Sequence, residues 1–139
     1  MFTATIYKVM IGSLSGAMEE VYVAKEIIRK WNQIYSEREK VVFLQEDKDC
    51  VKDNIDLIIG IIGNYIKGCD RIEDYAQSGT RVILLFQQFH SPENTIPNEI
   101  NDLRSFKNRI EPFSSCYEFN GNSELESVLT RELQKVVLQ

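Results

Sequence analysis

The sequence predicts an α/β protein with a three-layer, flavodoxin-like arrangement around a five-stranded, mostly parallel sheet. Apolar runs typical of strands alternate along the chain with segments of helical periodicity. The run NIDLIIGII at residues 54–62 is almost continuously apolar, as in a central parallel strand that is covered on both faces. No linker, repeat or low-complexity segment divides the 139 residues, a length typical of one domain. We therefore expect a single domain over residues 1–139.

Each expected element has its own local signal. The first strand spans residues 5–11, and the helix after it, over 17–36, repeats apolar residues from Val21 to Trp31 at helical spacing. Gly79 is a plausible C-cap, and Ser123 with Glu126 has the spacing of a capping box. The remaining strands are expected at 41–44, 54–62, 81–86 and 115–119, and the remaining helices at 69–78, 98–109 and 123–137.

The bulk composition limits the function. A net charge of -5 argues against a general nucleic-acid binder. The three cysteines show no CxxC spacing, which indicates free thiols in a reducing compartment. No apolar run nears the length of a membrane span and no signal peptide is evident, so we expect a cytoplasmic protein without a membrane partner. A single histidine and no Cys/His cluster predict neither a metal site nor a cofactor.

The segment IGSLSG raises the question of a ligand site. In open parallel sheets, ligands bind beyond the carboxyl ends of the strands, and this segment follows the first strand. The two glycines allow close approach of a ligand, the serines offer hydroxyls, and the next helix begins with free N–H groups suited to phosphate. The alternative is a polar loop in which Ser15 caps the helix and Glu19 and Glu20 complement its dipole. The residues of the candidate site here are Gly12, Ser13, Leu14, Ser15 and Gly16.

Two further loops leave strand ends at the same edge. Tyr65, Lys67 and Arg71 could stack a base and hold phosphates, although surface charge is the simpler interpretation. Glu73 and Asp74 could supply a general base or form a solvated helix face. The remaining residues in this region are binding candidates (Gly63, Asn64, Gln87 and Phe89), a loop histidine without a paired nucleophile (His90) and an expected core tryptophan (Trp31).

The segment MIGSLSGAMEEVYVAKEIIRKWNQIYS, residues 10–36, resembles the start of a bacterial domain of unknown function that is often attached to defence-associated NTPases. DLIIGII at 56–62, IEDYAQSGTRVILLF at 72–86 and LRSFK at 103–107 resemble later parts of the same domain, so that the similarity spans nearly the whole chain. Its most specific part is the helix with the Trp-Asn pair. The matching residues of the first segment are Ser13, Ser15, Glu19, Glu20, Ala24, Glu26, Trp31 and Asn32.

That family is similar to nucleoside 2-deoxyribosyltransferases and, more distantly, to TIR domains, which act on N-glycosidic bonds of nucleosides or NAD. The resemblance implies a glutamate eight residues before the glycine that precedes the fourth strand, because cleavage builds an oxocarbenium ion that an anion stabilises. Counting back from Gly79 gives Arg71. A cation at about 4 Å would oppose the charge by roughly 4 kcal/mol at an effective dielectric near 20. Leu14, Gly16 and Val21 also depart from the family pattern of proline, aspartate and arginine.

These observations predict a protein that binds a nucleotide-derived small molecule without cleaving it. The ligand would be ADP-ribose-like or a cyclic nucleotide immune signal, and the setting could be a phage protein that sequesters it. One alternative is an active N-glycosidase or deoxyribosyltransferase that uses Asp70, Glu73 or Glu20; the other is a protein-interaction module. We expect a homo-oligomer in each case, since family pockets are often completed by a neighbouring subunit.

Overall fold

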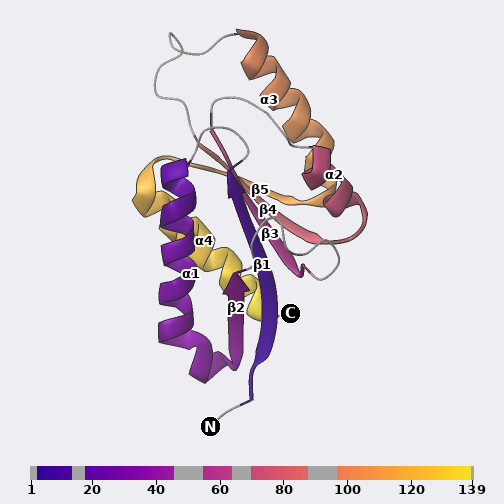
Figure 1. Ribbon diagram of the computed structural model, residues 1–139. Helices are drawn as coiled ribbons and strands as arrows, with labels where there is room; N and C mark the ends of the chain where they lie inside the picture. The colour runs from indigo at the N-terminus through magenta and orange to yellow at the C-terminus, as the bar shows by residue number, and fades with distance from the viewer. Residues whose placement is uncertain (1–2, 14–17, 46–54, 64–69, 88–96, 139) are drawn as a thin grey trace.

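The computed structural model describes residues 3–13, 18–45, 55–63, 70–87 and 97–138. Its five strands form one all-parallel sheet in the order β2-β1-β3-β4-β5, which confirms the flavodoxin-like prediction (Figure 1). The chain runs from β1 outward to β2 and returns to β3, so β1 and β3 are neighbours although β2 separates them in sequence. The strands are β1 (Thr5–Ser13), β2 (Val41–Gln45), β3 (Leu57–Ile62), β4 (Arg81–Gln87) and β5 (Ser115–Phe119).

Helices cover both faces of the sheet. In Figure 1, α1 and α4 lie on one side of the strands, and α2 and α3 lie on the other. This gives the three layers that the sequence predicts. No helix in the described ranges combines the length and the apolar character that a membrane span needs. The helices are α1 (Met18–Glu39), α2 (Asp70–Gln77), α3 (Pro97–Ile110) and α4 (Gly121–Val137), with a short 3-10 turn, η2 (Glu111–Phe113), before β5.

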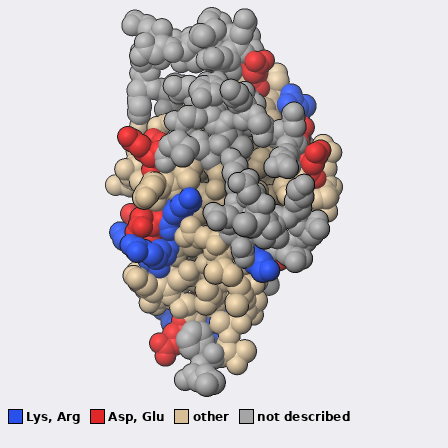
Figure 2. All heavy atoms as spheres, in the orientation of Figure 1, with Lys and Arg blue, Asp and Glu red and all other residues tan. Residues whose placement is uncertain are grey.

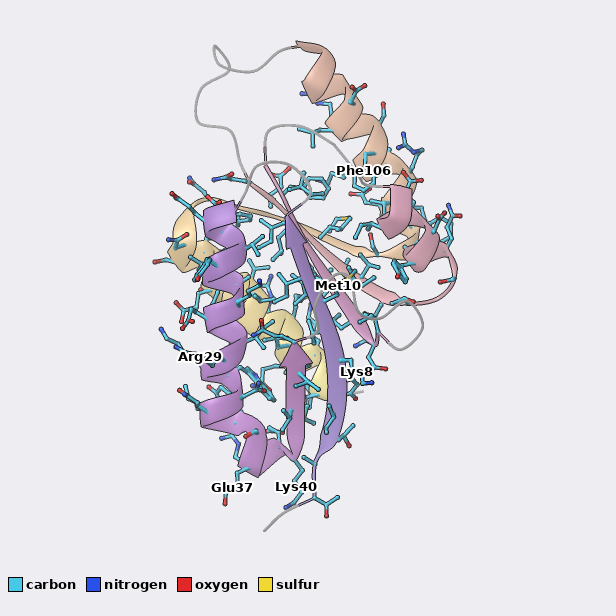
Figure 3. All side chains as sticks on the ribbon, viewed as in Figure 1. Lys8, Met10, Arg29, Glu37, Lys40 and Phe106 are labelled. Carbon is cyan, nitrogen blue, oxygen red and sulfur yellow. The ribbon has the colours of Figure 1, made fainter. Side chains whose placement is uncertain are left out.

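The central strand β3 is buried along its whole length, as its apolar run predicts. Its side chains alternate between two cores: Ile59 lies in the core under α1 and α4, and Ile58 in the core under α2 and α3. The fully buried Phe106 belongs to this second core, and the partly buried Met10 of β1 packs against the same core (Figure 3). Each face of the sheet therefore has its own hydrophobic layer.

The Trp-Asn pair of α1 anchors that helix to the edge strand β2. Trp31 is only 2% exposed, and its ring meets the ring of Phe43 edge-on at 4.8 Å between centroids. Asn32 is hydrogen-bonded to the main chain of the same phenylalanine. The prediction of a core tryptophan is confirmed, and the pair acts in packing.

Local chemistry explains where several elements begin and end. Gly79 has φ +97°, and the N–H of the following Thr80 donates to the carbonyl of Tyr75, so the predicted C-cap is confirmed. β3 begins at Leu57, later than expected, because Asp56 instead uses its side chain and its N–H to bond the main chain of Lys8. Both bonds are 2.9 Å long.

The predicted capping box of the last helix is wrong. α4 begins at Gly121, two residues earlier than expected, and its N-cap is Asn120. Ser123 therefore lies inside the first turn, where it cannot act as the N-cap residue, and Asn120 makes no side-chain capping bond. The positive φ of Gly121, +83°, allows the chain to turn sharply from β5 into this helix.

Candidate functional site

The strand order creates a switch point between β1 and β3. The chain leaves β1 toward α1 on one face and leaves β3 toward α2 on the other, so the two exits diverge above neighbouring strands. In doubly wound sheets the crevice at such a point is the usual ligand site. Ser13, the last residue of β1, pairs in register with Ile61, one residue before β3 ends. The candidate loops predicted from the sequence leave the sheet at this edge.

The described structure covers only part of the predicted site. Gly12, Gly63, Gln87, Glu20 and Glu73 are described in full, whereas Ser13, Asp70 and Arg71 are described as backbone in β1 and at the start of α2. The remaining candidates lie outside the described residues: Leu14, Ser15, Gly16, Asn64, Tyr65, Lys67, Phe89 and His90.

Glu20 and Gln87 meet at the carboxyl edge of the sheet. The Nε2 of Gln87, the last residue of β4, donates to Oε1 of Glu20 in the first turn of α1 at 3.0 Å, and the contact is partly buried. α1 follows β1 and Gln87 ends β4, while β3 lies between these two strands. The hydrogen bond therefore spans the carboxyl end of β3, beside the switch point.

Two glycines lie side by side in the same half of the sheet. Gly12 of β1 is in register with Gly60 of β3. By strand alternation both face the α2/α3 side, as Met10 and Ile58 do two residues earlier on the same strands. At this register position, two neighbouring strands both lack a side chain on that face, immediately below the switch point.

Glu73 is not turned toward this edge as a free carboxylate. Its Oε1 accepts from Nη2 of Arg109 at 2.9 Å and from Nε at 3.3 Å, which ties α2 to the last turn of α3. Its neighbour Asp74 is exposed to solvent. Asp74 therefore lies on a solvated helix face, whereas Glu73 forms an ion pair between two helices and its side chain is only 20% exposed. Arg109 was missed from the sequence, because no spacing rule predicts an ion pair between residues 36 apart.

Among the residues that the structure describes, two hollows lie at the opposite end of the sheet. One, of about 350 Å³, is lined by the turn after α2 and the starts of β4 and β5, including Gly79, Arg81 and Phe113. The other, of about 120 Å³, is lined by Arg81, Glu132 and residues of β4, β5 and α4. Both are at the amino ends of the strands, away from the switch point, which lies at the carboxyl ends of β1 and β3.

Glu132 is the one buried charged residue among those that the structure describes fully. Nζ of Lys135 lies 2.9 Å from its Oε2 and also donates to the Tyr117 hydroxyl at 3.4 Å. The hydrogen bond to Glu132 and, to a smaller extent, the one to Tyr117 raise the pKa of Lys135 above its usual value. This network fixes α4 on β5. Within the described ranges, no three His, Cys, Asp or Glu residues converge in a way that could hold a metal ion.

The charged side chains elsewhere are mixed in sign. Figure 2 shows basic and acidic groups next to one another on the visible face, and on α1 Arg29 pairs with Glu26 at 2.6 Å. On this face the two signs of charge are therefore interspersed (Figure 2). No family model and no curated protein matches this sequence.

Proposed function

We propose that this protein binds a nucleotide-derived small molecule at the carboxyl edge of its sheet and does not cleave it. The observation that carries the proposal is the switch point between β1 and β3, with the Glu20–Gln87 hydrogen bond across the end of β3. The Gly/Ser segment between β1 and α1 and the amino end of that helix would receive phosphate groups. The ligand is ADP-ribose-like or a cyclic nucleotide.

The sequence around α2 supports binding over catalysis. The resemblance to deoxyribosyltransferases implies a glutamate eight residues before Gly79, and this chain has Arg71 there. A guanidinium favours phosphate and disfavours the positive charge that develops when an N-glycosidic bond breaks. The nearest described carboxylate on α2, that of Glu73, is engaged by Arg109. The proposed role is therefore retention of an intact ligand.

A protein of this kind would act by lowering the free concentration of its ligand. In the defence setting that the resemblance implies, the ligand is an immune signal and the protein a phage-encoded sink for it. Stoichiometric capture needs no turnover, which agrees with the altered position at Arg71. Homo-oligomerisation remains a prediction of the same resemblance.

Calorimetry tests the binding step. The purified chain is titrated with ADP-ribose, cyclic ADP-ribose isomers and cyclic dinucleotides, and the bound compound is then recovered and weighed by mass spectrometry. We expect saturable binding of at least one compound and its recovery intact. The proposal would be refuted if none of these compounds binds, or if the bound compound is recovered as a hydrolysed product.

One observation favours a second candidate function, an N-glycosidase or deoxyribosyltransferase. Glu20 places an oriented carboxylate at the carboxyl edge, where a reacting sugar would lie. Its test is release of free base from NAD or deoxynucleosides. Activity that is lost in Glu20→Gln and kept in Glu26→Gln, an equal change on the exposed side of the same helix, would establish this function instead.

A further inference from the structure

We infer that the Glu20–Gln87 pair recognises the vicinal hydroxyls of a ribose, so that the protein selects ribonucleotide-derived ligands over their deoxy counterparts. The inference rests on the proposed function, since it names the chemical group that the same edge reads. It concerns two described side chains from elements far apart in sequence, separated by 67 positions.

The position of the pair suits contact with a ligand at the switch point. Gln87 is one residue beyond the Ile62–Phe86 register pair, level with the point at which the chain leaves β3. Glu20 reaches it from the first turn of α1. The two polar groups therefore form a short bridge above the end of β3, on the side of the sheet that α1 covers.

The hydrogen-bond chemistry of the pair is fixed by the carboxylate. An ionised carboxylate only accepts, so Gln87 donates its amide N–H to Glu20, and the carbonyl oxygen of the same amide group keeps its capacity to accept another hydrogen bond. Among the described residues, no other hydrogen bond is made by either side chain. The pair consequently offers two acceptor groups side by side, one carboxylate and one amide carbonyl.

Two neighbouring acceptors match two neighbouring hydroxyl donors. The 2′ and 3′ hydroxyls of ribose are such a pair, and a carboxylate is the group with which dinucleotide-binding folds hold a ribose hydroxyl. A 2′-deoxyribose supplies only one donor and would leave an acceptor of the pair desolvated without a partner. The unmatched acceptor should therefore make a 2′-deoxyribose ligand bind more weakly than its ribose counterpart.

Binding of three probes tests the inference: ADP-ribose, ADP and 2′-deoxy-ADP. ADP-ribose against ADP reports the distal ribose, and ADP against 2′-deoxy-ADP reports the ribose attached to adenine. We expect the wild-type protein to lose at least about tenfold in affinity at one of these two steps, as for a hydrogen bond to a charged group. In Glu20→Gln and Gln87→Ala, that ratio should fall to about twofold or less. Glu26→Gln, at a half-exposed position on the same helix, is the matched control and should keep the wild-type ratio.

The outcomes separate this inference from the proposed function. The inference is wrong if the wild-type protein binds a probe but shows no difference in affinity in either comparison. It is also wrong if the variants lose affinity equally for all probes, because the pair then only holds α1 against β4. If the wild-type protein binds a cyclic nucleotide but none of the three probes, the inference is wrong and the proposed function stands; if it binds no cyclic nucleotide either, the proposed function fails. Melting temperatures of the variants, measured in parallel, show whether each protein is folded.

Discussion

The side-chain amide of Asn32 hydrogen-bonds both main-chain groups of Phe43. Its Nδ2 donates to the carbonyl oxygen at 2.9 Å, and its Oδ1 accepts from the N–H at 3.0 Å. Since β2 is an edge strand with β1 on one side only, these two groups would otherwise face outward without a strand partner. One side chain of α1 therefore satisfies the outward-facing main-chain groups of Phe43 at the sheet edge.

Replacement of Asn32 by alanine should destabilise the protein by about 2 kcal/mol, because two hydrogen bonds worth about 1 kcal/mol each are lost. The freed edge should also promote self-association at high concentration. Chemical denaturation and sedimentation measure the two effects. Asn108→Ala, an exposed position on α3, is the control. Equal stability of both variants would show that Asn32 contributes nothing to the edge.

Replacement of Trp31 should depend strongly on the new residue. Trp31→Ala removes a buried ring and should cost about 3–5 kcal/mol. Trp31→Phe should cost clearly less, because the indole Nε1 has no hydrogen-bond partner among the described residues and its loss removes a buried unpaired donor. Denaturant titration followed by circular dichroism measures both. A phenylalanine variant as unstable as the alanine variant would contradict this account.

Arg71→Glu should weaken binding of ADP-ribose by at least about tenfold, because the cation that we propose to pair with phosphate becomes an anion. The comparison is calorimetric, with Arg104→Glu, an exposed position on α3, as a control of equal charge change. The same affinity in both variants would place the ligand away from the start of α2.

Glu73→Ala should leave ligand binding unchanged. Glu73 is held by Arg109 between α2 and α3, and both side chains are partly open to solvent, so the loss of stability should not exceed about 1 kcal/mol. Calorimetry and thermal melts provide the measurements. If base release from NAD were present in the wild type and abolished by this variant, the second candidate function would be correct, with Glu73 as its carboxylate.

The Glu132–Lys135 contact should make stability depend on alkaline pH. The pKa of Lys135 is raised in the folded protein above the usual 10.5, so folding favours the protonated amine. Its contribution is therefore present below about pH 10.5 and is lost as the pH rises through the folded-state value. Melting temperatures from pH 9 to 12 should fall less steeply for Lys135→Met than for the wild type. Lys30→Met, at an exposed position on α1, should follow the wild-type curve.

Much of the architecture was predictable from local patterns. The apolar runs and the helical repeat gave the element order, and the short strand at Ser115–Phe119 has the predicted bounds. Gly79 marked a helix end because that turn needs a positive φ, which glycine adopts without strain. The capping box at Ser123 and Glu126 was wrong because the helix starts two residues earlier, at Gly121, whose positive φ turns the chain out of β5.

The sequence by itself determined the order of the strands and helices and the apolar face of each, because hydrophobic periodicity is a local property that survives in any tertiary arrangement. It also identified Glu20, Gln87, Trp31 and Asn32 as notable residues. Only the tertiary structure decided which of them meet. Asn32 joins Phe43, Gln87 joins Glu20, and Glu73 joins Arg109, since such pairs depend on strand order and helix packing and not on spacing along the chain.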